Sequence, residues 1–466
     1  MSKSHSSAYL LTRWEPEDPR FWEEQGRRIA QRNLWISIPN LLLAFAVWMV
    51  WSVVVVNLPN LGFAYSANQL FWLAALPGLS GATLRIFYSF MVPIFGGRRW
   101  TAISTASLLL PALGIGFAVQ NTGTPYVVML VLALLCGFGG GNFASSMANI
   151  SFFFPKSQKG TALGLNAGLG NLGVSTVQFV VPLVITAGVF GFLGGEPLTW
   201  TDGSTTKQMW LQNAGFIWVP FITIAALAAW FGMHDIATAK ASFRDQAIIF
   251  RRKHNWLMCW LYLGTFGSFI GYAAGFPMLI KTQFPSIDAM QYAFLGPLVG
   301  ALIRPLGGWL SDMLGGAKVT FWNFIAMAVA VLGVLYFLPA NGSGGNFWGF
   351  LAMFMVLFIT TGIGNGSTFR MVPVIFMTER LREAEGKGAQ AQEQAVRDAN
   401  KEGAAVLGFS SAIAAYGGFF IPKSYGTSIS MTGGPEMALY GFIAFYITCI
   451  AMTWWYYARR HAEMPC

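Results

Sequence analysis

The sequence predicts an all-α polytopic membrane protein, with roughly twelve membrane-spanning helices in two similar six-helix bundles. Three observations support this prediction. Hydrophobic residues make up 55% of the 466-residue chain and charged residues only 10%. Apolar stretches recur along the whole chain, and spaced motifs in the first half return in the second. A soluble domain does not need so large an apolar fraction to fill its core, so we place the chain in a lipid bilayer.

The apolar stretches have the length of about 20 residues that a helix needs to cross a bilayer. The predicted spans are 34–57, 69–95, 101–119, 125–150, 161–189, 214–233, 255–280, 290–311, 319–338, 347–377, 403–425 and 438–457. We expect an arm at 1–33, a bundle at 34–233, a charged linker at 234–254, a second bundle at 255–457 and a tail at 458–466. In the arm, Asp18 is a predicted N-cap and Pro19 the first residue of a helix at the membrane surface.

The net charge of +10 would suit a nucleic-acid-binding protein, but the basic residues follow a membrane pattern. They concentrate in the arm, the linker, the tail and alternate loops, whereas the opposite side has only Lys207, Lys281 and Lys423. By the positive-inside rule, both ends of the chain are expected in the cytoplasm. We therefore expect no nucleic-acid partner. The first residues are polar, so span 34–57 is expected to act as an uncleaved first helix.

The sequence contains no pattern typical of a metal or cofactor site. Cys136, Cys259 and Cys449 lie inside predicted spans without a CxxC or histidine partner, and Cys466 follows the last span. The loops are too short for a catalytic or signalling domain. We therefore expect no metal, no cofactor and no enzymatic activity.

The two halves carry the same motifs at the same spacing, as in many transporters built from repeats. Arg85 in the second predicted span is followed eleven residues later by a Gly-Gly pair, and Arg304 in the eighth span is followed in the same way. The matching register continues to Arg99 and Lys318. The fourth and tenth spans also share a three-glycine pattern, formed by Gly137, Gly139 and Gly141 and by Gly362, Gly364 and Gly366.

Three arginines, Arg85, Arg304 and Arg370, lie inside predicted spans, where a charged side chain costs at least about 2.5 kcal/mol. The repeat gives the first two equivalent positions, so we expect them to face each other near the axis between the bundles. Pairing with buried carboxylates is the alternative, but all 19 acidic residues lie in tails, loops or span ends. An anion must then neutralise the arginines. A planar guanidinium fits a planar oxyanion better than a spherical halide.

Two further groups of residues belong to the predicted transport site, namely neutral hydrogen-bond donors and glycines. Asn171 on the fifth span and Tyr262 on the seventh either donate hydrogen bonds to the anion or are satisfied core groups, and the sequence leaves this open. The glycine-rich stretches 164–175 and 408–422 let helices approach closely, slide or bend, although ordinary small-residue packing is the alternative. Within these stretches we single out Gly164, Gly168, Gly170, Gly417 and Gly418.

The turn after the eighth span, Gly308-Trp-Leu-Ser-Asp312-Met-Leu-Gly315-Gly316-Ala-Lys318, resembles the loop motif of the major facilitator superfamily. The resemblance implies the fold of that superfamily. It also implies a gate that Asp312 and Lys318 lock, with Arg99 at the position equivalent to Lys318. A capped surface turn is the other interpretation of these residues.

The two glycine-rich stretches resemble the paired signature motifs of the nitrate/nitrite porter family, and the likeness is closest to bacterial NarK-type antiporters. RIFYSFMVPIFGGRRW from Arg85, GNFASSMANISFFFP from Gly141 and LYLGTFGSFIG from Leu261 resemble this family too. The resemblance implies that Arg85 and Arg304 hold nitrate or nitrite. The resemblance also implies that Asn171 and Tyr262 donate hydrogen bonds to the anion and that Phe143 and Phe266 form aromatic walls on either side of it. Ser411 and Gly170 are expected to make further contacts.

The same resemblance implies a monomer in the bacterial inner membrane that serves nitrate assimilation or respiration. Three residues depart from the family pattern. Ala414 and Tyr416 are larger than expected in the eleventh span, and Arg370 stands where relatives carry glutamine. Arg370 either changes affinity or ion preference, or lines an exit path about one helical turn beyond Gly366.

Exchange by rocker-switch alternating access is the expected mode of transport, because no acidic residue or histidine lies mid-span to carry a proton. Two arginines roughly 8 Å apart repel by about 2 kcal/mol at an effective dielectric of about 20, so a bound anion eases closure of the site. Nitrate/proton symport through a tyrosine, a bound water or the substrate is the alternative. An anion channel is a further one.

Overall fold

A computed structural model describes residues 9–239, 247–340 and 344–466. Parts of the predicted arm (1–8) and of the predicted linker (240–246) therefore lie outside the described residues. Within the described residues, 12 helices are long and apolar enough to cross a membrane. This confirms the all-α polytopic fold. The spans are Pro19–Asn57, Ala67–Tyr88, Gly97–Ala118, Tyr126–Phe153, Lys156–Val184, Asn213–Gly232, Lys253–Gln283, Ala289–Leu314, Gly316–Phe337, Phe347–Glu383, Ala389–Thr432 and Glu436–Ala458.

The chain forms two compact units. The first holds the described residues up to 239, with 276–278 and 289–294, and the second holds the other described residues. The helices of the first unit are α1 (Pro19–Phe21), α2 (Arg27–Trp48), α3 (Trp51–Asn57), α4 (Ala67–Tyr88), α5 (Met91–Phe95), α6 (Gly97–Ser107), α7 (Leu109–Ala118), α8 (Tyr126–Leu135), α9 (Gly137–Phe153), α10 (Lys156–Val184), α11 (Asn213–Phe216) and α12 (Trp218–Gly232). The helices of the second are α14 (Lys253–Tyr262), the π-helix η5 (Leu263–Gly267), α15 (Ser268–Gln283), α16 (Leu295–Leu314), α17 (Gly316–Phe337), α18 (Phe347–Glu383), α19 (Ala389–Ala415), α20 (Gly417–Thr432) and α21 (Glu436–Thr453).

Local sequence signals explain where the first two spans begin. The Asp18 carboxylate accepts a hydrogen bond from the Arg20 N–H at 2.9 Å, and Pro19 is the first residue of α1, as predicted. This helix is not a separate short helix, because it continues through a π-helical turn (Trp22–Gly26) into α2. The helix α4 begins with a capping box, in which Ser66 and Gln69 exchange side-chain-to-backbone hydrogen bonds.

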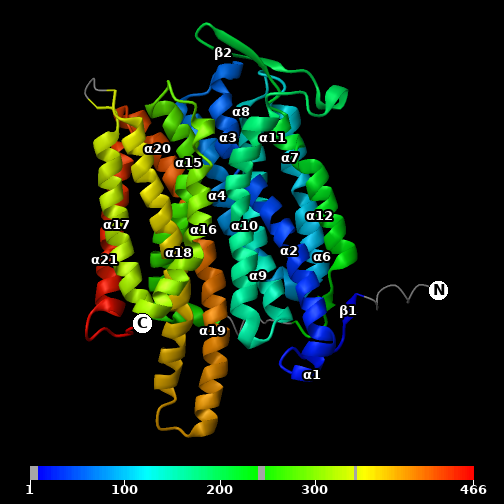
Figure 1. Cartoon of the computed structure of the whole chain (residues 1–466), viewed down its shortest axis with the longest axis vertical. Helices are drawn as coiled ribbons and strands as arrows, with labels where there is room; N and C mark the ends of the chain where they lie inside the picture. The colour runs from blue at the N-terminus through cyan, green and yellow to red at the C-terminus, as the bar shows by residue number, and fades with distance from the viewer. Residues whose placement is uncertain (1–8, 240–246, 341–343) are drawn as a thin grey trace, which may run out of the picture. The chain divides into compact units, whose positions relative to one another are not determined.

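Four short strands were not predicted from the sequence. Strands β2 (Leu198–Asp202) and β3 (Thr205–Met209) form an antiparallel hairpin, which lies at the opposite end of the first unit from α1 (Figure 1). Strand β1 (Leu10–Leu11) pairs in parallel with β4 (Asp235–Ile236). Each strand is at most five residues long, so its hydrophobic period is too short to stand out among the apolar helices.

The Gly-Gly-basic turn of the first unit is built around Asp235, which follows the last helix of that unit. The Asp235 carboxylate accepts hydrogen bonds from the backbone N–H of Arg98 at 2.8 Å and from its Nε at 3.3 Å. Gly96 has a φ of 87°, and a Cβ there would overlap this carboxylate. Glycine is therefore required both by the backbone conformation and by the approach of Asp235.

The equivalent turn of the second unit is capped in a similar way. Gly315 has a φ of 93°, and the N–H of Ala317, at the start of α17, donates to the Cys466 carbonyl at 2.9 Å. Ala317 is the repeat equivalent of Arg98. In each unit, a segment that follows the last helix thus accepts from a backbone N–H at the start of the third span that has no partner within its own helix.

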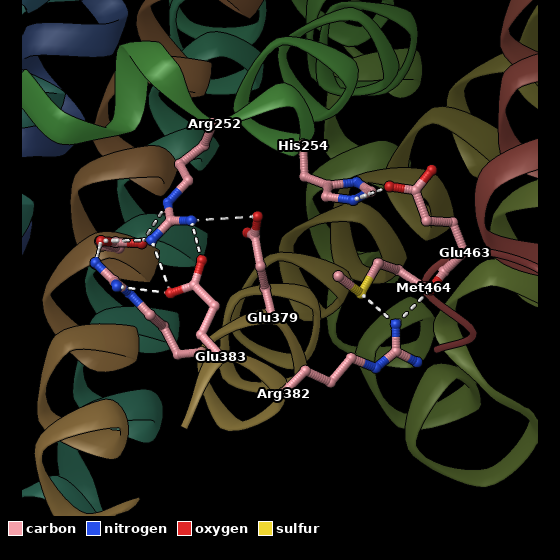
Figure 2. Close-up of polar contacts among 9 residues, drawn as sticks. Arg252, His254, Glu379, Arg382, Glu383, Glu463 and Met464 are labelled. Atoms are coloured by element: carbon pink, nitrogen blue, oxygen red, sulfur yellow. Dashed lines mark hydrogen bonds and ion pairs between the residues drawn. The ribbon is translucent and has the colours of Figure 1, made fainter. Parts of the chain in front are cut away.

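A cluster of five charged residues fastens α18 and α19 to the start of α14. Arg252 forms ion pairs with Glu379, Glu383 and Glu402, and Arg380 pairs with Glu383 and Glu402. Figure 2 shows Arg252 beside Glu379 and Glu383. The hydrogen bond with Glu383 raises the pKa of the Arg252 guanidinium above its usual value. Beyond this cluster, α18 and α19 run side by side past the ends of the other helices of their unit (Figure 1).

Replacing Arg252 by glutamine is expected to destabilise the protein by about 3 kcal/mol, because it removes the ion pair of Glu379 and leaves Glu383 and Glu402 to share Arg380 in a partly buried place. The matched control is Arg397→Gln, which breaks an exposed pair with Glu393 and should cost at most about 0.5 kcal/mol. Thermal unfolding of the purified variants measures both changes. Equal melting temperatures for the two variants would contradict the assigned role of the cluster.

Candidate anion-binding site

Arg85 lies on α4 inside the first unit and is only 1% exposed. Its Nε donates a hydrogen bond to the Gly140 carbonyl on α9 at 2.8 Å. The centre of its guanidinium lies 4.6 Å from the ring of Phe143 and 5.1 Å from that of Trp48. The structure thus brings the predicted site residue Phe143 to Arg85. It adds Trp48 as a neighbour that sequence analysis missed.

Arg304 lies on α16 inside the second unit and is 9% exposed. Its Nη2 donates to the Tyr262 hydroxyl at 3.4 Å, and its guanidinium lies 5.3 Å from the ring of Phe369. Tyr262 in turn stacks on Phe266 with ring centroids 5.6 Å apart. The predicted residues Arg304, Tyr262 and Phe266 therefore form one group, and Phe369 was missed.

The guanidinium of Arg304 is held by neutral groups and has bonding capacity to spare. Among the described residues, no hydrogen-bond acceptor reaches its buried Nη1 atom. A buried charged donor without a partner is costly, and an anion that accepts from Nη1 would remove much of that cost. The group is therefore suited to bind a small anion.

The residues predicted on the fifth span have different surroundings. Asn171 is buried on α10, and its Oδ1 makes no hydrogen bond to any part of the chain that the structure describes. Gly170 packs against the side chain of Leu41 on α2, where a Cβ would lie 2.6 Å away. Gly164 and Gly168 have open space around the position of a Cβ, so neither is required by packing inside the described chain.

The residues predicted on the eleventh span lie where that helix is interrupted. Ser411 is buried on α19 and donates to the Gly408 carbonyl at 2.8 Å. The helix breaks at Tyr416, after which Gly417 and Gly418 open α20 and are both buried. A Cβ on Gly417 would overlap the backbone of Gly267 in η5, so the two backbones lie in close contact here.

Of the predicted gating residues, Asp312 forms its ion pair with Arg370 and not with Lys318. The Asp312 carboxylate lies 2.5 Å from Nε of Arg370, and both side chains are about half exposed. They border a cavity of about 100 Å³ that also touches Gly315 and Gly316. Arg99, half exposed, lies 3.8 Å from Asp235. Arg370 thus differs from Arg304, because its charge is already paired with a carboxylate.

Comparison with known proteins agrees with this architecture. The Major Facilitator Superfamily profile matches residues 41–387. The chain is 55% identical to the nitrate/nitrite transporter NarU of Escherichia coli, over 99% of this chain and 98% of that protein. It is 45% identical to the probable nitrate/nitrite antiporter NarK2 of Thermus thermophilus over the full length of both.

The chain belongs to the nitrate/nitrite porter family of the major facilitator superfamily. The fold agrees with solved members of the superfamily. A D-xylose–proton symporter has a TM-score of 0.63 at 15% identity and covers 91% of this chain and 97% of its own. A bacterial homologue of the lysosomal transporter Spinster has a TM-score of 0.61 at 14% identity, with coverage of 90% and 95%. These two show the fold alone. The family consists of transporters, so the expectation that the chain is not an enzyme is confirmed.

In this porter, Gly417→Ala is expected to prevent folding or to lower stability strongly, because the methyl group would overlap the Gly267 backbone, which cannot move aside cheaply. Gly441→Ala on α21 is the matched control, since a Cβ there meets nothing within 4 Å and alanine favours a helix. Yield of monodisperse protein and its melting temperature measure the effect. A Gly417→Ala variant as stable as the control would exclude the close contact.

Proposed function

We propose that this porter exchanges nitrate for nitrite across the bacterial inner membrane by rocker-switch alternating access. The observation that carries the proposal is the buried Arg304 guanidinium, whose Nη1 lacks an acceptor among the described residues and whose Nη2 reaches the Tyr262 hydroxyl. The names of the relatives NarU and NarK2 support the same cargo. The distribution of lysines and arginines supports both chain ends in the cytoplasm. We expect the porter to act as a monomer.

In the proposed site, Arg85 and Arg304 each donate to oxygen atoms of one anion. Tyr262 and Asn171 are the neutral donors, and Ser411 and Gly170 belong to the surroundings of the site. Phe143 and Phe266 supply aromatic faces for a flat anion. Nitrate and nitrite are planar and monovalent, so they match guanidinium forks and flat walls better than a halide does.

In the proposed cycle, opening and closing depend on the charge of the site. A bound anion offsets the repulsion between the two arginines, whereas an empty site keeps it. The loaded porter therefore changes state easily and the empty porter does not, which gives exchange. Asp312, Lys318, Arg99 and the glycines Gly164, Gly168, Gly417 and Gly418 are the proposed gating residues, and Arg370 borders the path.

Arg304→Lys and Arg85→Lys are each expected to reduce nitrate/nitrite counterflow at least 100-fold. A lysine keeps the charge but loses the planar fork that binds two oxygen atoms, and a loss of about 3 kcal/mol corresponds to this factor. Counterflow of labelled nitrate in proteoliposomes measures it. Arg397→Lys, on the exposed surface, is the control and should transport like the wild type.

Exchange predicts that nitrate uptake into proteoliposomes requires nitrite or nitrate on the other side. Nitrate/proton symport is the second candidate, and the hydrogen-bonded hydroxyl chain of Ser268, Tyr446 and Tyr272 in the second unit is the feature that favours it. Rapid net uptake driven by a pH gradient alone would overturn exchange and support symport. Transport without saturation would instead support a channel.

A further inference from the structure

Trp48, at the end of α2, is completely buried and contacts α4 at two places. Its Nε1 donates a hydrogen bond to the Pro77 carbonyl at 2.7 Å. Its ring lies 5.1 Å from the centre of the Arg85 guanidinium, two helical turns further along α4. The hydrogen bond fixes the indole, and the fixed indole presents its face to the arginine.

Two glycines make the space that this indole ring occupies, and a third lies beside the Cβ of Trp48. A Cβ on Gly81 of α4 would overlap its Nε1, and a Cβ on Gly140 of α9 would lie 2.6 Å from its Cε2. A Cβ on Gly139 would lie 3.1 Å from the Cβ of Trp48 and would overlap the Ala44 carbonyl. Gly81 and Gly140 therefore leave room for the tryptophan ring, whereas Gly139 mainly allows the close approach of α9 to the α2 backbone.

The equivalent glycines of the second unit, Gly362, Gly364 and Gly366, do not make room for an aromatic ring beside the arginine. A Cβ on Gly364 would meet Thr265 and Asn323, and a Cβ on Gly366 would overlap the backbone of α16 at Arg304. Within the described chain, one ring, that of Phe369, lies at the Arg304 guanidinium, whereas Arg85 lies among the rings of Phe45, Trp48 and Phe143. The repeat is therefore symmetric in sequence spacing but not in the way it holds its arginines.

Aromatic rings and a carbonyl hold a cation without neutralising it. The ring faces carry partial negative charge and attract the guanidinium, while the Gly140 carbonyl accepts from Nε. A carboxylate in the same place would cancel the charge that an anion needs. The surroundings of Arg85 thus orient its side chain.

We propose that Trp48 is a positioning residue that sets the orientation of Arg85 for anion binding. This inference rests on the proposed function, because it takes nitrate or nitrite as the ligand. Arg85 is then the fixed half of the site, since its ring contacts and hydrogen bond come from α2 and α9. Arg304, held by one ring and one 3.4 Å hydrogen bond, is the half that adjusts to the anion.

The test compares Trp48→Phe and Trp48→Leu with the control Trp51→Leu. Trp51 is equally buried one turn further along the chain, so its loss removes a similar amount of core without a ring at Arg85. Titration of the purified porter with sodium nitrate and sodium chloride measures binding, and thermal unfolding measures stability. We expect Trp48→Leu to weaken nitrate binding about tenfold and to reduce the preference for nitrate over chloride. Trp48→Phe should retain most of both, because it keeps a ring.

Gly81→Ala provides an independent arm, since its methyl group displaces the indole without removing it. It should weaken nitrate binding as Trp48→Leu does, whereas Gly160→Ala, with open space at its Cβ, should bind like the wild type. Wild-type nitrate affinity in a Trp48→Leu variant that is destabilised like Trp51→Leu overturns the inference and leaves the proposed function intact. A wild-type porter that neither binds nitrate nor catalyses counterflow overturns the proposed function itself.

Discussion

The architecture depends on a positive charge kept in an apolar bundle without being cancelled. An isolated guanidinium is costly away from water, and the usual remedy is a carboxylate partner. Arg304 is instead contacted by a ring and a hydroxyl, which reduce the cost and preserve its charge, and Arg85 lies among rings and beside a carbonyl. Three other arginines behave in the opposite way. Arg98, Arg252 and Arg370 are each paired with carboxylates, so their charges stabilise the structure and are not available to a ligand.

The fold was predictable because its signals are long or repeated. A stretch of about 20 apolar residues predicts a membrane-spanning helix without ambiguity. The repeat places Arg85 and Arg304 at equivalent positions of the two halves, so each supports the prediction made for the other. The residues that were missed are marked in the sequence neither by a long apolar stretch nor by a repeat. Trp48 is one aromatic residue among many in the first span, and nothing in its spacing indicates a contact with Arg85. Asp235 lies in a charged linker, so only the folded chain brings it to the turn at Gly96.

The contacts of the glycines were also not predictable from the sequence. Sequence analysis treated the glycine-rich stretches of the fifth and eleventh spans as one device for close helix contact. The structure separates them, because Gly417 lies directly against the backbone of Gly267 whereas Gly164 and Gly168 have space at their Cβ positions. Glycine can be required because another backbone packs closely against it, because an aromatic ring does, or because a turn needs a positive φ. The sequence alone does not distinguish these causes. The ion pair of Asp312 with Arg370 illustrates a related point, since the motif supplied the acid but not its partner.

The contacts of Asp235 bear on the order in which the chain is assembled. Strand β1 and the turn at Gly96 are both synthesised early, yet both wait for partners that lie just beyond α12. Helices enter the membrane one after another as the ribosome makes them, so this junction closes once the sixth span has emerged. At that moment the first unit has all its described residues except 276–278 and 289–294, which come later in the chain. It is able to reach most of its native packing during translation, before most of the second unit exists.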